Sequence, residues 1–255
     1  MTRTEFVVIV PARWASTRLP GKMLADLAGL PLVVRVAQRA LLSKALRVLV
    51  ATDSEEIAQA TRKHGIETLM TLASHPTGTD RLAECARALG LRDDEIVVNV
   101  QGDEPLIDPA LINEVAKALG EDEQAAIATC AAPISDLDAL TNPNVVKVVR
   151  DLQGRALYFS RSSIPFVRCA DQPVTALHHI GIYAYRVAFL KAFPTLSQGR
   201  LEQVESLEQL RALEHGFKIC VSVTDSQVAA GVDTEADLQR VRRVFEGNRQ
   251  ARAAS

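Results

Sequence analysis

Three cationic side chains follow the first apolar run of the chain and are spaced closely enough to act on one ligand. Arg13, Arg18 and Lys22 stand in the stretch PARWASTRLPGK, separated by small residues such as Ser16 and Gly21. Fixed cations and accessible backbone N–H groups are what a triphosphate needs for binding. Most basic loops are merely solvated, but a loop that follows a strand of a parallel sheet lies where ligands bind. We therefore predict that these three side chains hold phosphates.

Two common phosphate-binding motifs do not fit this loop. A Walker A loop would need a glycine where Ser16 stands and a serine or threonine where Met23 stands. The dinucleotide pattern GxGxxG is also absent from the sequence, which argues against a dehydrogenase on a doubly wound sheet. The loop is therefore expected to cradle phosphates by a different arrangement.

Two aspartates are candidates for binding a magnesium ion beside those phosphates. Asp103 follows an apolar run in NVQGDEP, and a carboxylate at a strand end beside a phosphate loop is typical of magnesium sites. Its alternative role, capping the next helix, fits Asp108 better because Asp108 precedes Pro109. Asp233 lies in the late stretch GVDTEADLQRV. Either Asp233 or Thr234 could cap the last helix, and the spacing leaves capping and metal binding equally open.

Further polar side chains stand on patterns that predict how they point. Thr79 is expected to cap a helix that begins at Asp80, and the N-terminus of that helix could meet a base or a sugar. His179 and Tyr183 alternate on a strand pattern and so face one side of a sheet. A lone histidine in such a position is more often structural than functional.

Arg161 and a group of helical residues complete the candidates. Arg161, in YFSRSSIP, carries a planar fork that could bind a carboxylate, or could merely pair with an acidic side chain. Glu205 and Glu208 are three residues apart, which places them on one face of an expected helix, and Gln209 adjoins them. An ordinary solvated helix surface is the alternative.

The elements that position these residues alternate in type through the first half of the chain. Short apolar runs predict strands, and apolar residues every three to four positions predict helices. The predicted strands are 6–10, 47–51, 67–71 and 96–100, and the predicted helices are 31–43, 55–64 and 80–89. Apolar strands separated by helices predict an α/β fold with a mostly parallel, doubly wound sheet. The polar loops follow the strands, so they meet at the carboxyl edge of this sheet.

The pattern changes after about residue 136. Three runs, 142–150, 155–159 and 179–186, read as strands without helices between them, which predicts an antiparallel β subdomain inserted into the main fold. A helical pattern returns over 201–215, before a last strand at 217–223 and a last helix at 235–245. We expect a single domain over 1–255, with the inserted β region at about 136–190.

Composition argues against several other classes of protein. The 255 residues are 47% hydrophobic, enough for a sizeable core, and the net charge of -2 does not favour a generic nucleic-acid binder. The four cysteines are far apart, which excludes zinc-ligand spacing, and three of them stand in apolar stretches typical of reduced core residues. No run approaches the ~20 apolar residues of a membrane span. The first apolar run is too short for a signal-peptide core, so we expect a cytoplasmic protein.

Seven motifs, in order from about residue 6 to 245, resemble the family of 3-deoxy-manno-octulosonate cytidylyltransferases, also called CMP-Kdo synthetases. They are PARWASTRLPGK, HPTGTDR, NVQGDEP, YFSRSSIP, HHIGIYAYR, ESLEQLRALEHG and GVDTEADLQRV. Trp14 and Met23 stand where the family pattern has Tyr and Pro, and neither has a polar role. The resemblance implies a nucleotidyltransferase fold and transfer of CMP from CTP to Kdo, with release of pyrophosphate, for lipopolysaccharide synthesis. It also implies Mg²⁺ as cofactor and a homodimer formed largely through the inserted β region.

The resemblance further implies a role for each candidate residue. The catalytic residues would be Lys22, Asp103 and Arg13, with Lys22 at the α-phosphate. The nucleotide would contact Ala12, Arg13, Arg18, Lys22, Thr79, Asp80 and Gln101. The sugar would contact Gln101, Arg161, His179, Tyr183, Glu208 and Gln209. Asp103 and Asp233 would hold the magnesium ion.

Two other functions compete with this one. A CMP-sialic acid synthetase or another sugar nucleotidyltransferase is the nearest alternative, and a panel of nucleotides and sugars would separate them. A nucleotide-sensing module without catalysis could use the same fold. Such a module would not need both Lys22 and Asp103, because sensing does not require a cation poised at the α-phosphate.

Overall fold

A central mixed sheet organises the chain, and the carboxyl ends of its parallel strands carry the candidate site. The computed structural model describes residues 4–16, 19–168, 175–225 and 231–253. Its nine-stranded sheet has the order β3-β2-β1-β4-β8-β5-β9, with β6 branching from β8 and β7 pairing with β6. The strands are β1 Phe6–Ala12, β2 Arg47–Thr52, β3 Glu67–Met70, β4 Ile96–Asn99, β5 Ala125–Pro133, β6 Lys147–Arg150, β7 Ala156–Ser160, β8 Leu177–Arg186 and β9 Lys218–Val223.

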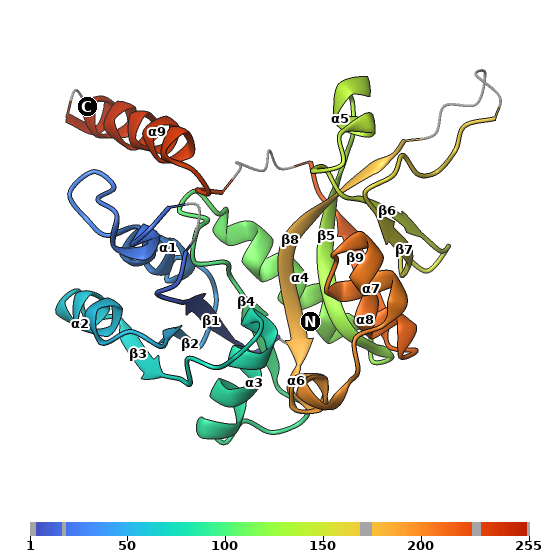
Figure 1. Ribbon diagram of the computed structural model, residues 1–255, viewed down its shortest axis with the longest axis horizontal. Coiled ribbons are helices and arrows are strands. Elements are labelled where there is room, and N and C mark those ends of the chain that lie inside the picture. Colours follow the sequence, from blue (N-terminus) through green and yellow to red (C-terminus); the bar gives the residue numbers. More distant parts are fainter. Residues whose placement is uncertain (1–3, 17–18, 169–174, 226–230, 254–255) are drawn as a thin grey trace.

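Helices cover both faces of this sheet, as expected for a doubly wound fold (Figure 1). The longer ones are α1 Leu32–Ala40, α2 Glu55–Lys63, α3 Gly78–Ala88, α4 Pro109–Glu121 and α9 Glu235–Ala253. The shorter ones are α5 Leu137–Thr141, α6 Val187–Ala192, α7 Arg200–Glu205 and α8 Gln209–Glu214, with single 3₁₀ turns at Lys22–Leu24 and Phe193–Thr195. The helices α1, α2 and α4 contribute to one apolar core and α3, α6 and α8 to the other. The last helix, α9, packs through Leu238 and Val241 on Leu32 of α1.

The predicted mostly parallel sheet with antiparallel strands is confirmed, and one of those antiparallel strands, β8, belongs to the main sheet. It lies in the middle of the main sheet and runs antiparallel to both neighbours, β4 and β5. Ile180 and Ile182 of this strand are buried in the core of the chain. The excursion from the main sheet is therefore the hairpin of β6 and β7, which pair antiparallel with each other.

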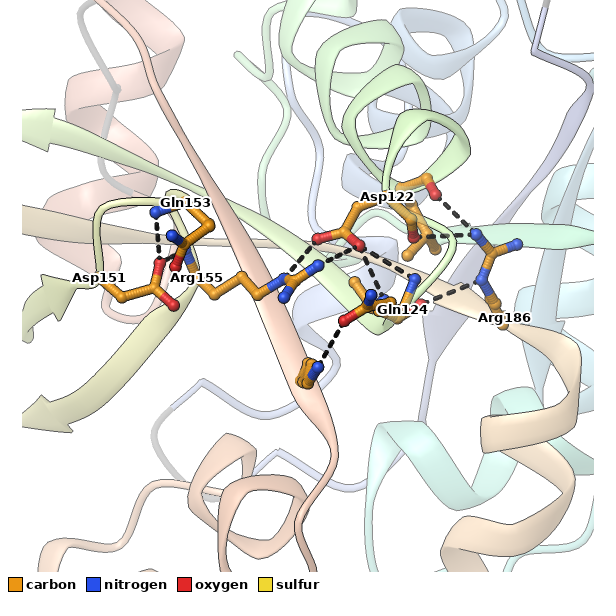
Figure 2. Close-up of polar contacts among 9 residues, drawn as sticks. Asp122, Gln124, Asp151, Gln153, Arg155 and Arg186 are labelled. Carbon is orange, nitrogen blue, oxygen red and sulfur yellow. Dashed lines mark hydrogen bonds and ion pairs between the residues drawn. The ribbon is translucent and has the colours of Figure 1, made fainter.

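An arginine network fastens this hairpin to the body of the molecule (Figure 2). Arg155 precedes β7 and donates two hydrogen bonds to Asp122, the residue that ends α4, at 2.8 and 2.9 Å. Arg186, at the end of β8, donates to the backbone carbonyls of Leu119, Asp122 and Ala125. Two planar guanidinium groups thus hold the carboxyl end of α4 against the β hairpin and the sheet.

Candidate active site

Two adjoining hollows lie along the carboxyl edge of the parallel strands. The larger, which we call the loop hollow, has a volume of about 520 Å³. It is lined by Pro11, Arg13, Ala15, Ser16, Lys22, Met23, His75, Pro76, Thr77, Gly78, Arg81, Gln101, Gly102, Asp103 and Asp233. These residues come from the end of β1 and the segment after it, from the segment between β3 and α3 and the first turn of α3, from the loop after β4 and from the segment before α9, so polar segments that follow three parallel strands do converge.

Lys22 is the electrostatic centre of the loop hollow. The side chain is 9% exposed, and its ammonium lies 2.7 Å from Asp103 Oδ2 and 3.2 Å from Asp233 Oδ1. The 3₁₀ turn Lys22–Leu24 begins directly after Gly21, which adopts a left-handed conformation with φ 68°. That turn aims the lysine at the two carboxylates, so one cation and two anions face the space where phosphates would lie.

The capping alternatives for the two aspartates are resolved by the hydrogen bonds. Asp108 Oδ1 accepts from Ala110 N at 2.9 Å and caps α4, as expected. For α9, Asp237 N donates to Thr234 Oγ1 and Asp237 Oδ2 accepts from Thr234 N, a reciprocal capping box. Asp103 and Asp233 are therefore not needed as caps, and their carboxylates point to Lys22 instead.

The loop after β1 is held in place by a buried ion pair. Asp53, after β2, accepts from Trp14 N through Oδ1 and from the Arg81 guanidinium through Oδ2, both at 2.9 Å. The Arg81 side chain is almost fully buried and also contacts Thr71. The same loop touches the loop after β4 so tightly that a Cβ on Gly102 would lie 2.6 Å from Pro11 O. Glycine is required at position 102 for this close approach.

The smaller space, which we call the aromatic hollow, has a volume of about 280 Å³ and lies between the sheet and α8. It is lined by Gly78, Thr79, Asn99, Gln101, Ile127, Tyr183, Tyr185, Phe189, Phe193, Glu208, Gln209 and Ala212. The rings of Tyr183 and Tyr185 stack at 5.8 Å, and those of Tyr185 and Phe189 at 6.0 Å. Flat aromatic walls with a few polar groups between them are typical of a site for a small organic ligand.

The cap of α3 explains how Thr79 reaches this hollow. Thr77, rather than the predicted Thr79, caps α3, since Asp80 N donates to Thr77 Oγ1 at 3.2 Å and the Thr77 hydroxyl donates to Asp80 Oδ2 at 2.8 Å. Thr79 thus sits in the first turn of α3, and its hydroxyl donates to Glu208. Burial raises the pKa of Glu208, an effect that the hydrogen bond from Thr79 opposes. The polar groups of Asp80 bind Thr77 in this cap, and Asp80 is not among the lining residues of either hollow.

The predicted helix over 201–215 is broken, which separates its two glutamates. Ser206 adopts a left-handed conformation with φ 51° and ends α7. Glu205 turns to the β hairpin, where it accepts from Ser160 Oγ at 2.6 Å and Arg161 N at 2.9 Å. Glu208 directly precedes α8 and lines the aromatic hollow with Gln209. The expectation that Glu205 and Glu208 share a helix face is therefore wrong.

Two of the predicted sugar-binding residues lie outside the aromatic hollow. The guanidinium of Arg161 donates to the backbone carbonyls of Pro143, Glu205 and Ser206, so its fork is occupied by the chain itself. His179 shares the face of Tyr183, as expected, with ring centroids 5.4 Å apart. It is buried, its Nε2 lies 3.0 Å from Thr129 Oγ1, and burial together with His178 lowers its pKa to about 3.

The remaining predicted residues divide between the hollows. Arg13 lines the loop hollow and is exposed, while Ala12 is fully buried beside it and could offer a ligand only its backbone. Gln101 lines both hollows, and Tyr183, Glu208 and Gln209 line the aromatic one. Arg18 lies outside the described residues.

Sequence reasoning missed several residues of the two hollows. Asn99 ends the apolar run of β4 and lines the aromatic hollow, and a polar residue at the end of a buried strand was the available signal. Phe189 and Phe193 were indistinguishable from ordinary core residues. His75 lines the loop hollow and contacts Glu84, which also accepts from Leu72 N.

Comparison with known proteins assigns this geometry to a family. A family model described as Cytidylyltransferase matches residues 7–219. The chain belongs to the cytidylyltransferases. The match includes both hollows except for Asp233, which lies beyond its last residue.

Two solved structures extend the comparison. CMP:2-keto-3-deoxy-manno-octonic acid synthetase complexed with CTP is 40% identical to this cytidylyltransferase, with a TM-score of 0.89 over 96% of this chain and 99% of that chain. The resemblance predicted from the motifs is therefore confirmed. A cytidylyltransferase from Leptospira borgpetersenii serovar Hardjo-bovis (strain JB197) is 16% identical, with a TM-score of 0.59 over 98% and 96% of the two chains. At that identity the likeness shows a shared fold alone.

Two of the site's carboxylates suit a magnesium ion. Asp103 Oδ2 and Asp233 Oδ1 converge on one cation position, which the ammonium of Lys22 holds in this structure. Magnesium is commonly bound by one or two carboxylates together with substrate phosphates and water, and the loop hollow offers that donor set. No group of three or more His, Cys, Asp or Glu side chains that could hold a metal occurs in the described part of the chain.

Proposed function

We propose that this cytidylyltransferase transfers CMP from CTP to 3-deoxy-D-manno-octulosonate (Kdo) and releases pyrophosphate. One observation carries the proposal: the loop hollow, with its cations, and the aromatic hollow share Gly78 and Gln101 as a common wall. A triphosphate in the first hollow and a sugar in the second would meet at that wall. The 40% identity to a CMP:2-keto-3-deoxy-manno-octonic acid synthetase supports CTP and Kdo as the two substrates.

The residues of the two hollows suit an in-line displacement. The anomeric hydroxyl oxygen of Kdo forms a bond to the α-phosphorus of CTP, the bond from that phosphorus to the bridging oxygen breaks, and the hydroxyl proton is lost to solvent. Lys22 and Arg13 hold the phosphates and offset negative charge that grows in the transition state. Gln101 and the N-terminus of α3 at Gly78 orient the reacting groups where the hollows adjoin.

Asp103 and Asp233 would hold the magnesium ion. When bound, the ion supplies positive charge that stabilises the phosphates and the leaving pyrophosphate. Lys22, which contacts both carboxylates here, would then be displaced toward the α-phosphate.

Further parts of the proposal rest on the resemblance. They are a homodimer formed through the β hairpin region, a cytoplasmic location and a role in lipopolysaccharide synthesis. Within the described residues, no helix combines the length and apolar character needed to cross a membrane. The hairpin region does expose apolar side chains, including Phe166 at 88% and Leu157 at 62%.

Pyrophosphate release tests the proposed reaction directly. The protein is incubated with Mg²⁺ and each of the four nucleoside triphosphates, with Kdo, with sialic acid or without an acceptor. We expect pyrophosphate release only when CTP and Kdo are supplied together. Release with CTP and sialic acid would assign the chain to the alternative, a CMP-sialic acid synthetase. Tight CTP binding without release from any acceptor would favour a nucleotide-sensing module.

A further inference from the structure

Asn99 places an unsatisfied hydrogen-bond acceptor deep in the aromatic hollow. It is the last residue of β4 and pairs with Ile9 of β1 and Tyr183 of β8, so it stands in the middle of the sheet. The residue is 3% exposed, and its Oδ1 has no hydrogen-bond partner among the described residues. Buried amide groups nearly always have a partner, so an orphaned oxygen that lines a hollow indicates where a ligand would bind.

Gln209 supplies the complementary group from the opposite wall. It is the first residue of α8 and is 8% exposed, and its Nε2 also has no hydrogen-bond partner within the part of the chain that the structure describes. A strand and a helix thus each contribute to the lining of the same hollow a residue with an unsatisfied amide atom. A ligand that satisfies both atoms must donate a hydrogen bond to Asn99 Oδ1 and accept one from Gln209 Nε2.

The chemistry of Asn99 Oδ1 limits what that ligand group can be. An amide oxygen accepts and does not donate, so it cannot be satisfied by the oxygens of a phosphate or an ionised carboxylate. It requires an O–H or N–H donor. Among the groups of a polyhydroxylated sugar acid, only a hydroxyl meets this requirement, whereas Gln209 Nε2 can donate either to a hydroxyl or to a carboxylate oxygen.

Aromatic and polar side chains line the hollow around Asn99. Tyr185, which is buried, interacts with the side chains of Asn99 and Thr79, and its ring stacks between Tyr183 and Phe189. Thr79 in turn donates to Glu208. A buried acceptor beside a flat aromatic wall can distinguish one hydroxyl of a sugar whose C–H face lies against the rings.

We infer that Asn99 is a specificity-determining residue that accepts a hydrogen bond from one hydroxyl group of the acceptor sugar. The inference rests on the proposed function, since it takes the aromatic hollow as the sugar site. Asn99 does not take part in bond making. It selects the acceptor by leaving a buried oxygen unsatisfied whenever the matching hydroxyl is missing.

A series of Kdo analogues, each lacking one hydroxyl, tests this role. For the wild-type protein, kcat/KM is expected to fall roughly 10- to 100-fold with the analogue that lacks the hydroxyl bound by Asn99. In Asn99→Ala, kcat/KM for Kdo should fall by a similar factor, and the difference between Kdo and that one analogue should disappear. Other analogues should keep their wild-type ratios.

Fold and nucleotide binding are measured in parallel. Asn99→Ala is expected to bind CTP as the wild type does, and Asn113→Ala, which removes an amide from α4 away from both hollows, serves as the matched control with unchanged kcat/KM. Asn99→Ser gives the same comparison if the alanine variant loses its fold. A wild type that folds and binds CTP but releases no pyrophosphate with Kdo would refute the proposed function itself.

Two results would overturn the inference while leaving the proposed function intact. One is normal turnover of Kdo by Asn99→Ala. The other is a loss of kcat/KM that is equal for Kdo and for every analogue, because a merely structural asparagine would affect all acceptors alike.

Discussion

Lys22 and Asp103 are 81 residues apart in the chain and form an ion pair of 2.7 Å at the floor of the loop hollow. The lysine is the more buried partner, with 9% of its side chain exposed against 28% for the aspartate. Together they join the loop after β1 to the loop after β4. The lysine also neutralises Asp233, so it occupies the place between two carboxylates where a divalent cation would be favourable.

Replacing Lys22 should separate binding from catalysis. In Lys22→Ala we expect kcat to fall roughly 100-fold or more, because a fixed positive charge is lost from the transition state, while the Kd for CTP changes much less. Turnover and calorimetric CTP binding check this. Near-normal turnover would mean that Lys22 is a cation of the loop with no catalytic role.

The same variant makes a second, non-kinetic prediction. Without the lysine, Asp103 and Asp233 face each other uncompensated, so Mg²⁺ should raise the melting temperature of Lys22→Ala more than that of the wild type. Thermal melts with and without Mg²⁺ measure the difference. Equal shifts in both proteins would mean that the ion does not bind between these carboxylates.

Asp233→Asn tests the metal role against a paired capping variant. Because Thr234 and Asp237 form the cap of α9, Asp233→Asn should keep its melting temperature and lose roughly 100-fold in turnover at low Mg²⁺, with partial rescue by more Mg²⁺ or by Mn²⁺. Thr234→Ala should instead lower stability by about 1 kcal/mol and keep its activity at saturating substrates. Full activity of Asp233→Asn at sub-millimolar Mg²⁺ would leave Asp103 as the sole carboxylate ligand.

Arg161→Lys distinguishes direct sugar binding from positioning. The wild-type guanidinium holds three backbone carbonyls, two of them on Glu205 and Ser206, which lead directly into Glu208 and Gln209. We expect the lysine variant to melt at a lower temperature and to show a raised KM for Kdo, with the KM for CTP unchanged. A raised KM for Kdo with no change in melting temperature would point to direct contact with the sugar's carboxylate.

The ion pair of Asp122 and Arg155 should make stability depend on pH. The hydrogen bonds from Arg155 lower the pKa of Asp122 below its ordinary value, so this carboxylate stabilises the folded state above about pH 4, the unfolded value. That contribution is lost as the pH falls through the lower, folded pKa. Urea midpoints of Asp122→Asn should therefore be below those of the wild type at pH 7, with a smaller gap at pH 3. The exposed pair of Arg92 and Asp94 supplies the control, since Asp94→Asn should show no gap at either pH.

Light scattering at micromolar concentration tests the dimer. We expect a mass of about twice 27.7 kDa. We also expect Phe166→Asp to shift the protein toward the monomer, because it replaces an exposed apolar side chain with a charged one. Lys63→Asp, on α2 at the opposite end of the sheet, is the matched control. A monomeric wild type would refute the dimer.

Hydrophobic periodicity predicted the parallel half of the sheet well because β1, β2 and β4 are rich in valine and isoleucine, which favour strands. It missed β5 because AAIATCAAP is dominated by alanine, which carries little strand signal although the segment is buried between β8 and β9. The place of β8 was unpredictable for a different reason: strand order depends on long-range pairing, which local patterns do not encode.

The candidate site was predictable where motifs placed charges next to strand ends. The side chains of Lys22, Asp103 and Asp233 meet because the segments after β1 and β4 and the segment before α9 lie at the same edge of the sheet. Misplaced residues share another cause, since the caps at Thr77 and Thr234 and the break at Ser206 are decided by which local hydrogen bonds form. Because α3 is capped at Thr77, two residues before the predicted cap, Thr79 lies inside the helix and donates a hydrogen bond to Glu208.

The reversed strand β8 also bears on how the chain is made. Among the described strands it alone pairs with both β4 and β5, yet it is synthesised after both of them. During translation, the parallel half-sheet of β1 to β4 therefore emerges with the apolar edge of β4 uncovered, and that edge is a template for pairing with other nascent chains. Arrival of residues 177–186 closes the edge and joins the two halves of the sheet in one step.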